Sequence, residues 1–327
     1  MAPNPLQRVL TAQGYVMLDG GSATTLEARG RVLDERLWSA RLLLDAPDAV
    51  RAMHQAFLEA GADCISTLSY QASFEGFARL GLSDAETVRV LRLSVSLAQE
   101  AKRAFWSDGR NRGGRREPIV AASAGPYGAY LADGSEYRGR YGVTKDALRE
   151  FHARRCEVLA DAGADVVAFE TIPALEEADA IADIIRNTDV WAWVSFSCRD
   201  GRRLWDGRPL SDAIRACLSS ERLAGVGVNC THPRFIDALI AEARAVTVLP
   251  IIVYPNSGET YDARLGTWTA GPAERDWSAD VRRWAALGAR VIGGCCRVGP
   301  GDIRTMRTAL DRWAAETRPL PPPNDRV

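Results

Sequence analysis

Three cysteines in the second half of the chain lie where their thiols could meet. Cys230 ends an apolar run, and Cys295 and Cys296 are adjacent and follow Gly293 and Gly294. Cysteine thiolates are good zinc ligands, and three protein ligands with an open fourth position are typical of a catalytic zinc. The spacing alone leaves two other interpretations open. The adjacent pair could form a disulfide, or the three thiols could be buried as small apolar groups.

The stretches that carry these cysteines belong to a regular alternation. Short apolar runs rich in β-branched residues are separated by longer amphipathic segments, and the segments 47–60, 144–162 and 276–287 show helix-end signals, such as a glycine after the last residue. Strand–helix units repeated in this way predict a (β/α)8 TIM barrel, and a doubly wound open sheet is the structural alternative. The candidate strands are 15–19, 64–70, 119–124, 166–170, 191–197, 224–229, 249–254 and 290–293.

The length and the composition fit one domain without unusual partners. We expect a single domain over residues 1–327, with a core at about 15–315 and a proline-rich tail at 316–327. Lys plus Arg is 41 and Asp plus Glu is 42, which argues against nucleic-acid and membrane-surface partners. The chain has no apolar segment of the signal-peptide or membrane-spanning kind, so we expect a cytoplasmic protein. The sequence makes no prediction of the oligomeric state.

The strand ends of such a barrel bring the reactive residues together. Active sites of TIM barrels lie at the carboxyl ends of the strands. Asp19 ends the first candidate strand, Glu170 the fourth and Cys230 the sixth, and Cys295 and Cys296 follow the eighth. The sixth and eighth strands are second neighbours, so their ends lie roughly 10 Å apart at about 4.8 Å per strand. Three cysteine side chains can close that gap around one ion.

Several short strings resemble the homocysteine S-methyltransferase family. They occur in the order of that family and span nearly the whole chain, from residue 15 to about residue 310. A further string, GAYLADGSEY at 128–137, resembles the branch of the family that uses S-methylmethionine. The family strings are LDGG at 18–21, SAGPYG at 123–128, FET at 169–171, GVNC at 227–230, YPNSGE at 254–259 and GGCC at 293–296.

The resemblance implies a zinc enzyme. It implies that Cys230, Cys295 and Cys296 hold Zn²⁺ and that the thiol of L-homocysteine takes the fourth position. The metal would deliver that thiol as a thiolate at neutral pH. The methyl donor would be a sulfonium, either S-methylmethionine or S-adenosylmethionine, and the product would be methionine.

The small-molecule substrates need further contacts. By resemblance, Asp19 and Glu170 lie near the substrate ammonium, although a salt bridge or a helix cap would also explain them. The amides of Gly20 and Gly21 could hold a carboxylate, because a ligand approaches most closely where there is no Cβ. Candidates for donor contacts, by a polar side chain or by a cation–π contact, are Asn229, Asn256, Tyr70, Tyr127, Tyr130, Tyr254 and Trp38. Turn formation would also explain the asparagines, and core packing the aromatic residues.

Other functions fit parts of the pattern. A zinc or thiol redox sensor would use Cys295 and Cys296, but it has no need of Asp19 and Glu170. A phosphate-binding barrel enzyme with a cradle at 299–301 leaves Cys230 unexplained. Betaine as the donor is disfavoured because betaine-using relatives have an aromatic residue where this chain has Gln71. A selenium-containing acceptor remains an alternative to homocysteine.

Overall fold

The computed structural model describes residues 3–32, 40–259, 261–262, 267–268 and 275–317. Eight parallel strands form one sheet in the order β1-β10-β7-β6-β5-β4-β3-β2. A parallel bridge between Leu18 and Cys64 joins the two edge strands β1 and β2, so the sheet closes into a barrel. The strands are β1 (Val16–Met17), β2 (Cys64–Ser66), β3 (Ile119–Ala124), β4 (Val166–Ile172), β5 (Ala192–Phe196), β6 (Leu223–Asn229), β7 (Ile251–Tyr254) and β10 (Ala289–Ile292).

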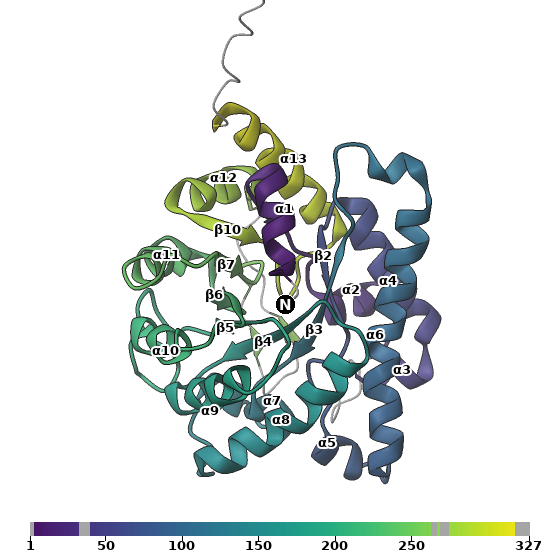
Figure 1. Cartoon of the computed structure of the whole chain (residues 1–327), viewed down its shortest axis with the longest axis vertical. Helices are drawn as coiled ribbons and strands as arrows, with labels where there is room; N and C mark the ends of the chain where they lie inside the picture. Colours follow the sequence, from purple (N-terminus) through teal and green to yellow (C-terminus); the bar gives the residue numbers. More distant parts are fainter. Residues whose placement is uncertain (1–2, 33–39, 260, 263–266, 269–274, 318–327) are drawn as a thin grey trace, which may run out of the picture.

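Helices surround this barrel (Figure 1). The principal ones are α4 (Pro47–Ala60), α6 (Asp84–Ser107), α8 (Lys145–Asp161), α9 (Leu175–Arg186), α10 (Leu210–Cys217), α11 (Ile236–Arg244), α12 (Trp277–Leu287) and α13 (Pro300–Thr317). Shorter elements lie between them: α2 (Ser22–Ala28), α3 (Leu42–Asp45), α5 (Phe74–Ala78), α7 (Tyr127–Leu131), the 3-10 turns η1 (Gly109–Arg112), η2 (Ser135–Tyr137) and η3 (Pro233–Phe235), and the antiparallel pair β8 (Tyr261–Asp262) and β9 (Thr267–Trp268).

An additional helix, α1 (Pro5–Gln13), closes one end of the barrel (Figure 1). Its buried residues Leu6 and Val9 belong to the same apolar cluster as the side chains inside the barrel, among them Trp193 and Ile252. The Asn4 side chain anchors the helix by donating to the Ala224 carbonyl at 3.3 Å. The carboxyl ends of the strands lie at the opposite end, so the reactive residues have only that end on which to form a site.

The sequence prediction of a TIM barrel is confirmed, and each of the predicted strands has its counterpart. The helix predicted at 47–60 is found at those residues, and Thr144 and Asp276 are the side-chain N-caps of α8 and α12. The second strand ends at Ser66, earlier than predicted, and beyond it the Thr67 hydroxyl rather than a backbone carbonyl accepts from the Ser123 amide at 3.0 Å. Helix α1 and the β8–β9 pair were not predicted. Residues 318–327 of the expected tail lie outside the described residues.

None of the helices among the described residues combines the length and the apolar character that crossing a bilayer requires.

One buried histidine gives the fold a pH dependence. His54 on α4 is fully buried, and neither of its ring nitrogens has a hydrogen-bond partner among the described residues. Burial lowers the pKa of His54 from 6.5 to about 4. Between these values the unfolded chain binds a proton that the folded chain does not, so stability falls as the pH falls through this window.

The substitution His54→Leu should therefore stabilise the protein and weaken this dependence. At pH 7 we expect the free energy of unfolding to rise by about 1 kcal/mol, because an unpaired buried polar group is removed. Between pH 6.5 and pH 4 the loss of stability should become smaller by up to about 3 kcal/mol. Urea unfolding at a series of pH values measures both effects. Parallel pH profiles for the variant and the wild type would contradict the interpretation.

Candidate functional site

The three cysteines singled out in the sequence come together at the carboxyl ends of β6 and β10. The Sγ atoms of Cys230, Cys295 and Cys296 all lie within 4.8 Å of one another. The backbone supports this arrangement, because the Cys230 amide donates to the Tyr254 carbonyl and the Cys295 amide donates to the Pro255 carbonyl at 2.8 Å. Cys230 has a positive φ of 44°, a conformation that residues other than glycine adopt mainly at constrained sites.

This set of sulfur atoms fits a tetrahedral zinc. Zn–S bonds of about 2.3 Å place neighbouring sulfur atoms about 3.8 Å apart, so small side-chain movements bring all three into range. Hydrogen bonding with the thiols of Cys230 and Cys296 lowers the pKa of Cys295. Three soft sulfur donors and no fourth cysteine in the group match an open zinc site rather than a closed structural one.

The loop after β10 packs directly on the end of β1. A Cβ at Gly20 would lie 2.2 Å from the Val298 carbonyl oxygen, and one at Gly21 would lie 2.5 Å from the Cys295 carbonyl oxygen. The Gly21 amide donates to the Val298 carbonyl at 2.9 Å, so it is already engaged. Of the two amides proposed from the sequence, only that of Gly20 lacks a partner among the described residues.

Asp19 is buried next to this loop. Its carboxylate accepts from the Ser66 amide at 2.7 Å and from the Ser66 hydroxyl at 3.2 Å. Burial raises the pKa of Asp19 to about 8, the bonds from Ser66 oppose the shift, and the charge of Glu170 adds to it. The two carboxyl groups proposed from the sequence therefore share one electrostatic environment.

Glu170 lies at the end of β4 and is held by two hydroxyl groups. It accepts from Ser123, and from the Tyr254 hydroxyl at 2.9 Å. Burial, together with the charge of Cys295, raises the pKa of Glu170 to about 7. A buried carboxyl group with such a pKa gains charge readily when a cation binds beside it.

Asn229 and Tyr254 support Glu170. The residue after Glu170, Thr171, has a φ of 64°, which is strained for a β-branched side chain. Asn229 holds it from both sides, since its Oδ1 accepts from the Thr171 amide at 2.7 Å and its Nδ2 donates to the Thr171 hydroxyl at 2.8 Å. Asn229 and Tyr254 are both buried inside the barrel, where their side chains bond to other groups of the protein.

Three further side chains lie near the thiols, and a fourth, that of Trp205, contacts one of them. Tyr70 donates to Glu136 at 3.2 Å, and burial and the charge of Cys295 raise the pKa of Glu136 to about 7. Burial and the charges of Glu136 and the three cysteines raise the pKa of Tyr137 well above its usual value. The Tyr137 ring meets the Trp205 ring edge to face at 5.8 Å.

Tyr127 and Tyr130 occupy a different place. Their rings pack against each other at 5.4 Å and against Phe151 of α8, forming an aromatic cluster with Tyr141. Asn256 has a buried Oδ1 without a partner among the described residues, so it can accept a bond from a ligand. Trp38 lies outside the described residues.

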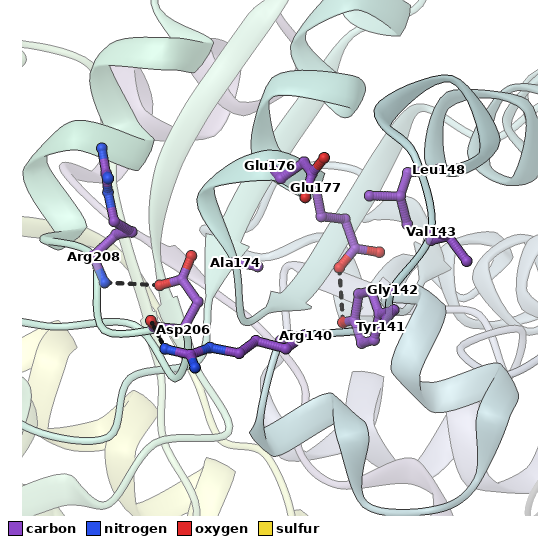
Figure 2. Close-up of a pocket in the computed structure, with 11 residues that line it drawn as sticks. Arg140, Tyr141, Gly142, Val143, Leu148, Ala174, Glu176, Glu177, Asp206 and Arg208 are labelled. Carbon is purple, nitrogen blue, oxygen red and sulfur yellow. Dashed lines mark hydrogen bonds between the residues drawn. The ribbon is translucent and has the colours of Figure 1, made fainter.

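The segment between β3 and α8, residues 125–144, is called the β3–α8 loop here; it carries Glu136 and Tyr137. The buried carboxylate of Glu177 on α9 fixes this loop by accepting from the Tyr127 amide at 2.6 Å. It also accepts from the Tyr141 hydroxyl at 2.9 Å (Figure 2). It also bonds to Nε2 of His152 at 2.8 Å. Because the guanidinium of Arg155 can only donate to Nδ1 of His152, Nε2 carries the hydrogen and donates it to Glu177.

A cavity of about 350 Å³ lies on the outer side of this loop (Figure 2). Arg140, Glu176, Asp206 and Arg208 line it, and none of the three cysteines does. The Arg140 side chain reaches the Asp206 carbonyl at 3.4 Å, and the Arg208 amide donates to the Asp206 carboxylate at 2.8 Å. The cavity is therefore distinct from the thiol site.

A family model described as homocysteine S-methyltransferase matches residues 16–310. The chain belongs to the homocysteine S-methyltransferase family. The family resemblance proposed from the sequence is thereby confirmed, and the chain is a methyltransferase that acts on homocysteine.

Relatives and solved structures agree with this assignment. Homocysteine S-methyltransferase YbgG of Bacillus subtilis (strain 168) is 48% identical over 304 residues, which are 93% of this chain and 96% of the relative. Selenocysteine Se-methyltransferase of Brassica oleracea var. italica is 42% identical over 308 residues, 91% of this chain and 89% of that protein. The metallated form of the homocysteine methyltransferase MmuM from Escherichia coli superposes with a TM-score of 0.84 at 40% identity, covering 93% of this chain and 99% of that one.

Three of the residues described above were not proposed from the sequence. Glu136 and Tyr137 lie in the string at 128–137 that resembles the S-methylmethionine branch, which was the available signal. Trp205 follows β5 outside every such string, and only the contact with Tyr137 reveals it.

The substitution Tyr254→Phe should lower kcat/KM for homocysteine about tenfold or more, because Glu170 loses the hydroxyl that aligns it. We also expect the free energy of unfolding to fall by about 1–3 kcal/mol. Tyr141→Phe is the matched control, since it removes a hydroxyl from another buried carboxylate, Glu177. It should lose comparable stability without this loss in kcat/KM. Equal catalytic losses in the two variants would show that the effect of Tyr254 is structural only.

Proposed function

We propose that this methyltransferase is zinc-dependent and moves a methyl group from a sulfonium donor, with S-methylmethionine preferred, to the thiol of L-homocysteine. One observation carries the proposal. Cys230, Cys295 and Cys296 form an open trio of sulfur ligands within 4.8 Å of one another, beside the buried carboxyl groups Asp19 and Glu170. This combination pairs a thiol-activating metal site with a receptor for the ammonium group of an amino acid.

The metal's contribution is chemical activation. Zinc held by the three cysteines would bind the homocysteine thiol and stabilise it as a thiolate at neutral pH. The protein residues then determine where the rest of the substrate lies. The ammonium group binds between Asp19 and Glu170, whose raised pKa values fall again when this cation arrives. The unpartnered Gly20 amide is the donor proposed for the substrate carboxylate.

The methyl transfer needs no reactant other than the two substrates. The thiol proton of homocysteine leaves to solvent when homocysteine binds. A lone pair of the thiolate sulfur then forms a bond to the donor methyl carbon, while the bond from that carbon to the sulfonium sulfur breaks. Its electron pair stays on the donor sulfur, which becomes a neutral thioether. Opposite charges disappear in this step, so an enclosed site of low polarity favours the transition state.

A selenol is a second candidate acceptor. The observation that favours it is the relative from Brassica oleracea, which is named a selenocysteine Se-methyltransferase and is 42% identical over 91% of this chain. Selenium is a soft ligand like sulfur, so the same trio of cysteines suits it.

Donor choice can be measured directly with the zinc-loaded protein. We expect S-methylmethionine to give the highest kcat/KM among S-methylmethionine, S-adenosylmethionine and betaine, each supplied with homocysteine. Methionine formation is the readout, and S-methylmethionine should give two methionines per turnover, one from each partner. A clear preference for betaine would contradict the sulfonium assignment. Turnover that persists undiminished after zinc removal by a chelator would contradict the metal dependence.

The ligand set is tested by Cys295→Ser. This variant should lose zinc affinity and turnover by more than the roughly 10–100-fold that removal of an outer-shell partner causes, because a direct ligand is lost. Metal analysis and methionine formation are the measurements. Cys217→Ser is the matched control, since Cys217 is a buried cysteine on α10 outside the trio. Full zinc content and turnover in Cys295→Ser would show that the proposed ligand set is wrong.

A further inference from the structure

The thiol site contains one carboxyl group more than homocysteine needs. Homocysteine has one ammonium group, and Asp19 and Glu170 already provide two carboxyl groups for it. Glu136 is a third one, and it comes from η2 in the β3–α8 loop rather than from a strand end. It lies at the same end of the barrel as the trio, because it accepts a hydrogen bond at 3.2 Å from Tyr70, which follows the carboxyl end of β2.

The fold holds Glu136 in a defined place. A Cβ at Gly128 would lie 2.4 Å from the Glu136 amide nitrogen, so α7 packs backbone to backbone on η2. A Cβ at Gly125 would lie 2.7 Å from the Tyr70 ring, whose hydroxyl donates to Glu136 at 3.2 Å. Glu177 fixes the same loop from its other side through Tyr127 and Tyr141.

Aromatic groups accompany this carboxylate. Tyr70 bonds to it, and Tyr137 is its chain neighbour and is affected by the charge of all three cysteines. The Trp205 ring lies edge to face on Tyr137 at 5.8 Å, and its buried Nε1 has no hydrogen-bond partner among the described residues. An acidic group and aromatic rings from three segments of the chain therefore lie together at the carboxyl end of the barrel.

This composition suits one kind of ligand. A sulfonium carries a positive charge on sulfur but has no N–H or O–H on that atom, so it cannot be bound there by donating a conventional hydrogen bond. Aromatic faces and an opposite charge are the protein groups that attract such a cation. The ammonium of homocysteine, which donates hydrogen bonds, is served instead by the carboxylates at the strand ends.

We propose that Glu136, together with the rings of Tyr70 and Tyr137, binds the positively charged sulfur of the methyl donor. The inference rests on the proposed function, because it presupposes a sulfonium donor. It assigns the two substrates to different carboxyl groups, with Asp19 and Glu170 binding homocysteine and Glu136 binding the donor. The donor sulfur then lies between Glu136 and the sulfur trio, where the acceptor thiolate is formed.

Steady-state kinetics can distinguish an effect on donor binding from an effect on homocysteine binding. In Glu136→Gln we expect the KM for S-methylmethionine to rise about tenfold or more, while the KM for homocysteine stays within about twofold. Calorimetric titration of S-methylmethionine into the zinc-loaded, homocysteine-free protein should show a similar loss of affinity. In Glu136→Asp, which keeps the charge, both donor constants should lie closer to those of the wild type.

Two controls exclude a general effect on the fold. Glu176→Gln makes the same chemical change in the outer cavity and should leave both KM values unchanged. Tyr137→Phe keeps the ring and should retain donor affinity, whereas Tyr137→Leu should lose it. This pair tests the site independently if Glu136→Gln does not fold.

The outcomes are distinguishable. A wild-type enzyme without activity on any sulfonium would overturn the proposed function itself. A wild type that uses S-methylmethionine, with an unchanged donor KM in Glu136→Gln, would overturn only this inference. Equal increases of both KM values in Glu136→Gln and Glu136→Asp would also overturn it, because they would indicate a structural role.

Discussion

The geometry of the site depends on the close packing of the loop after β10 against the end of β1. Gly20 and Gly294 both lie so near to Val298 that neither has room for a side chain. This contact places Cys295 beside the strand end that carries Asp19. A larger residue at either glycine would separate the metal ligands from a substrate carboxylate, although the barrel itself could remain closed.

Acidic groups gather at this end of the barrel. Asp19, Glu170 and Cys230 are buried there, and Glu136, Cys295 and Cys296 are half-buried, so the low polarity of the surroundings opposes ionisation of the carboxyl groups. Hydrogen bonds from Ser66, Ser123, Tyr254 and Tyr70 hold the carboxyl groups in place before any ligand arrives. Such an arrangement favours positively charged groups, which here are the proposed metal, the ammonium group of homocysteine and the sulfonium of the methyl donor.

The sequence predicted the barrel and the trio of cysteines because both follow from periodicity and from the rule that parallel strands end at one edge. The assignments of zinc as the metal and of homocysteine as the substrate came from the family strings, because the spacing of the cysteines alone also allowed a disulfide. The support of Glu170 by Asn229 was not predictable, because it depends on the positive φ of Thr171. Trp205 was missed because it meets Tyr137 only when the segment after β5 and the β3–α8 loop are folded together, and no pattern in the sequence indicates this contact.

The helix that closes the barrel has a consequence for the order of assembly. Helix α1 precedes every strand of the barrel in the chain, yet Asn4, next to it, bonds to Ala224, 220 positions later. Leu6 and Val9 can be buried only when the strands that surround them are already paired. Contacts of such high sequence separation form late, since the intervening chain must first be ordered. Helix α1 precedes the barrel in the chain, but it therefore docks only after the strands that enclose its apolar face have paired.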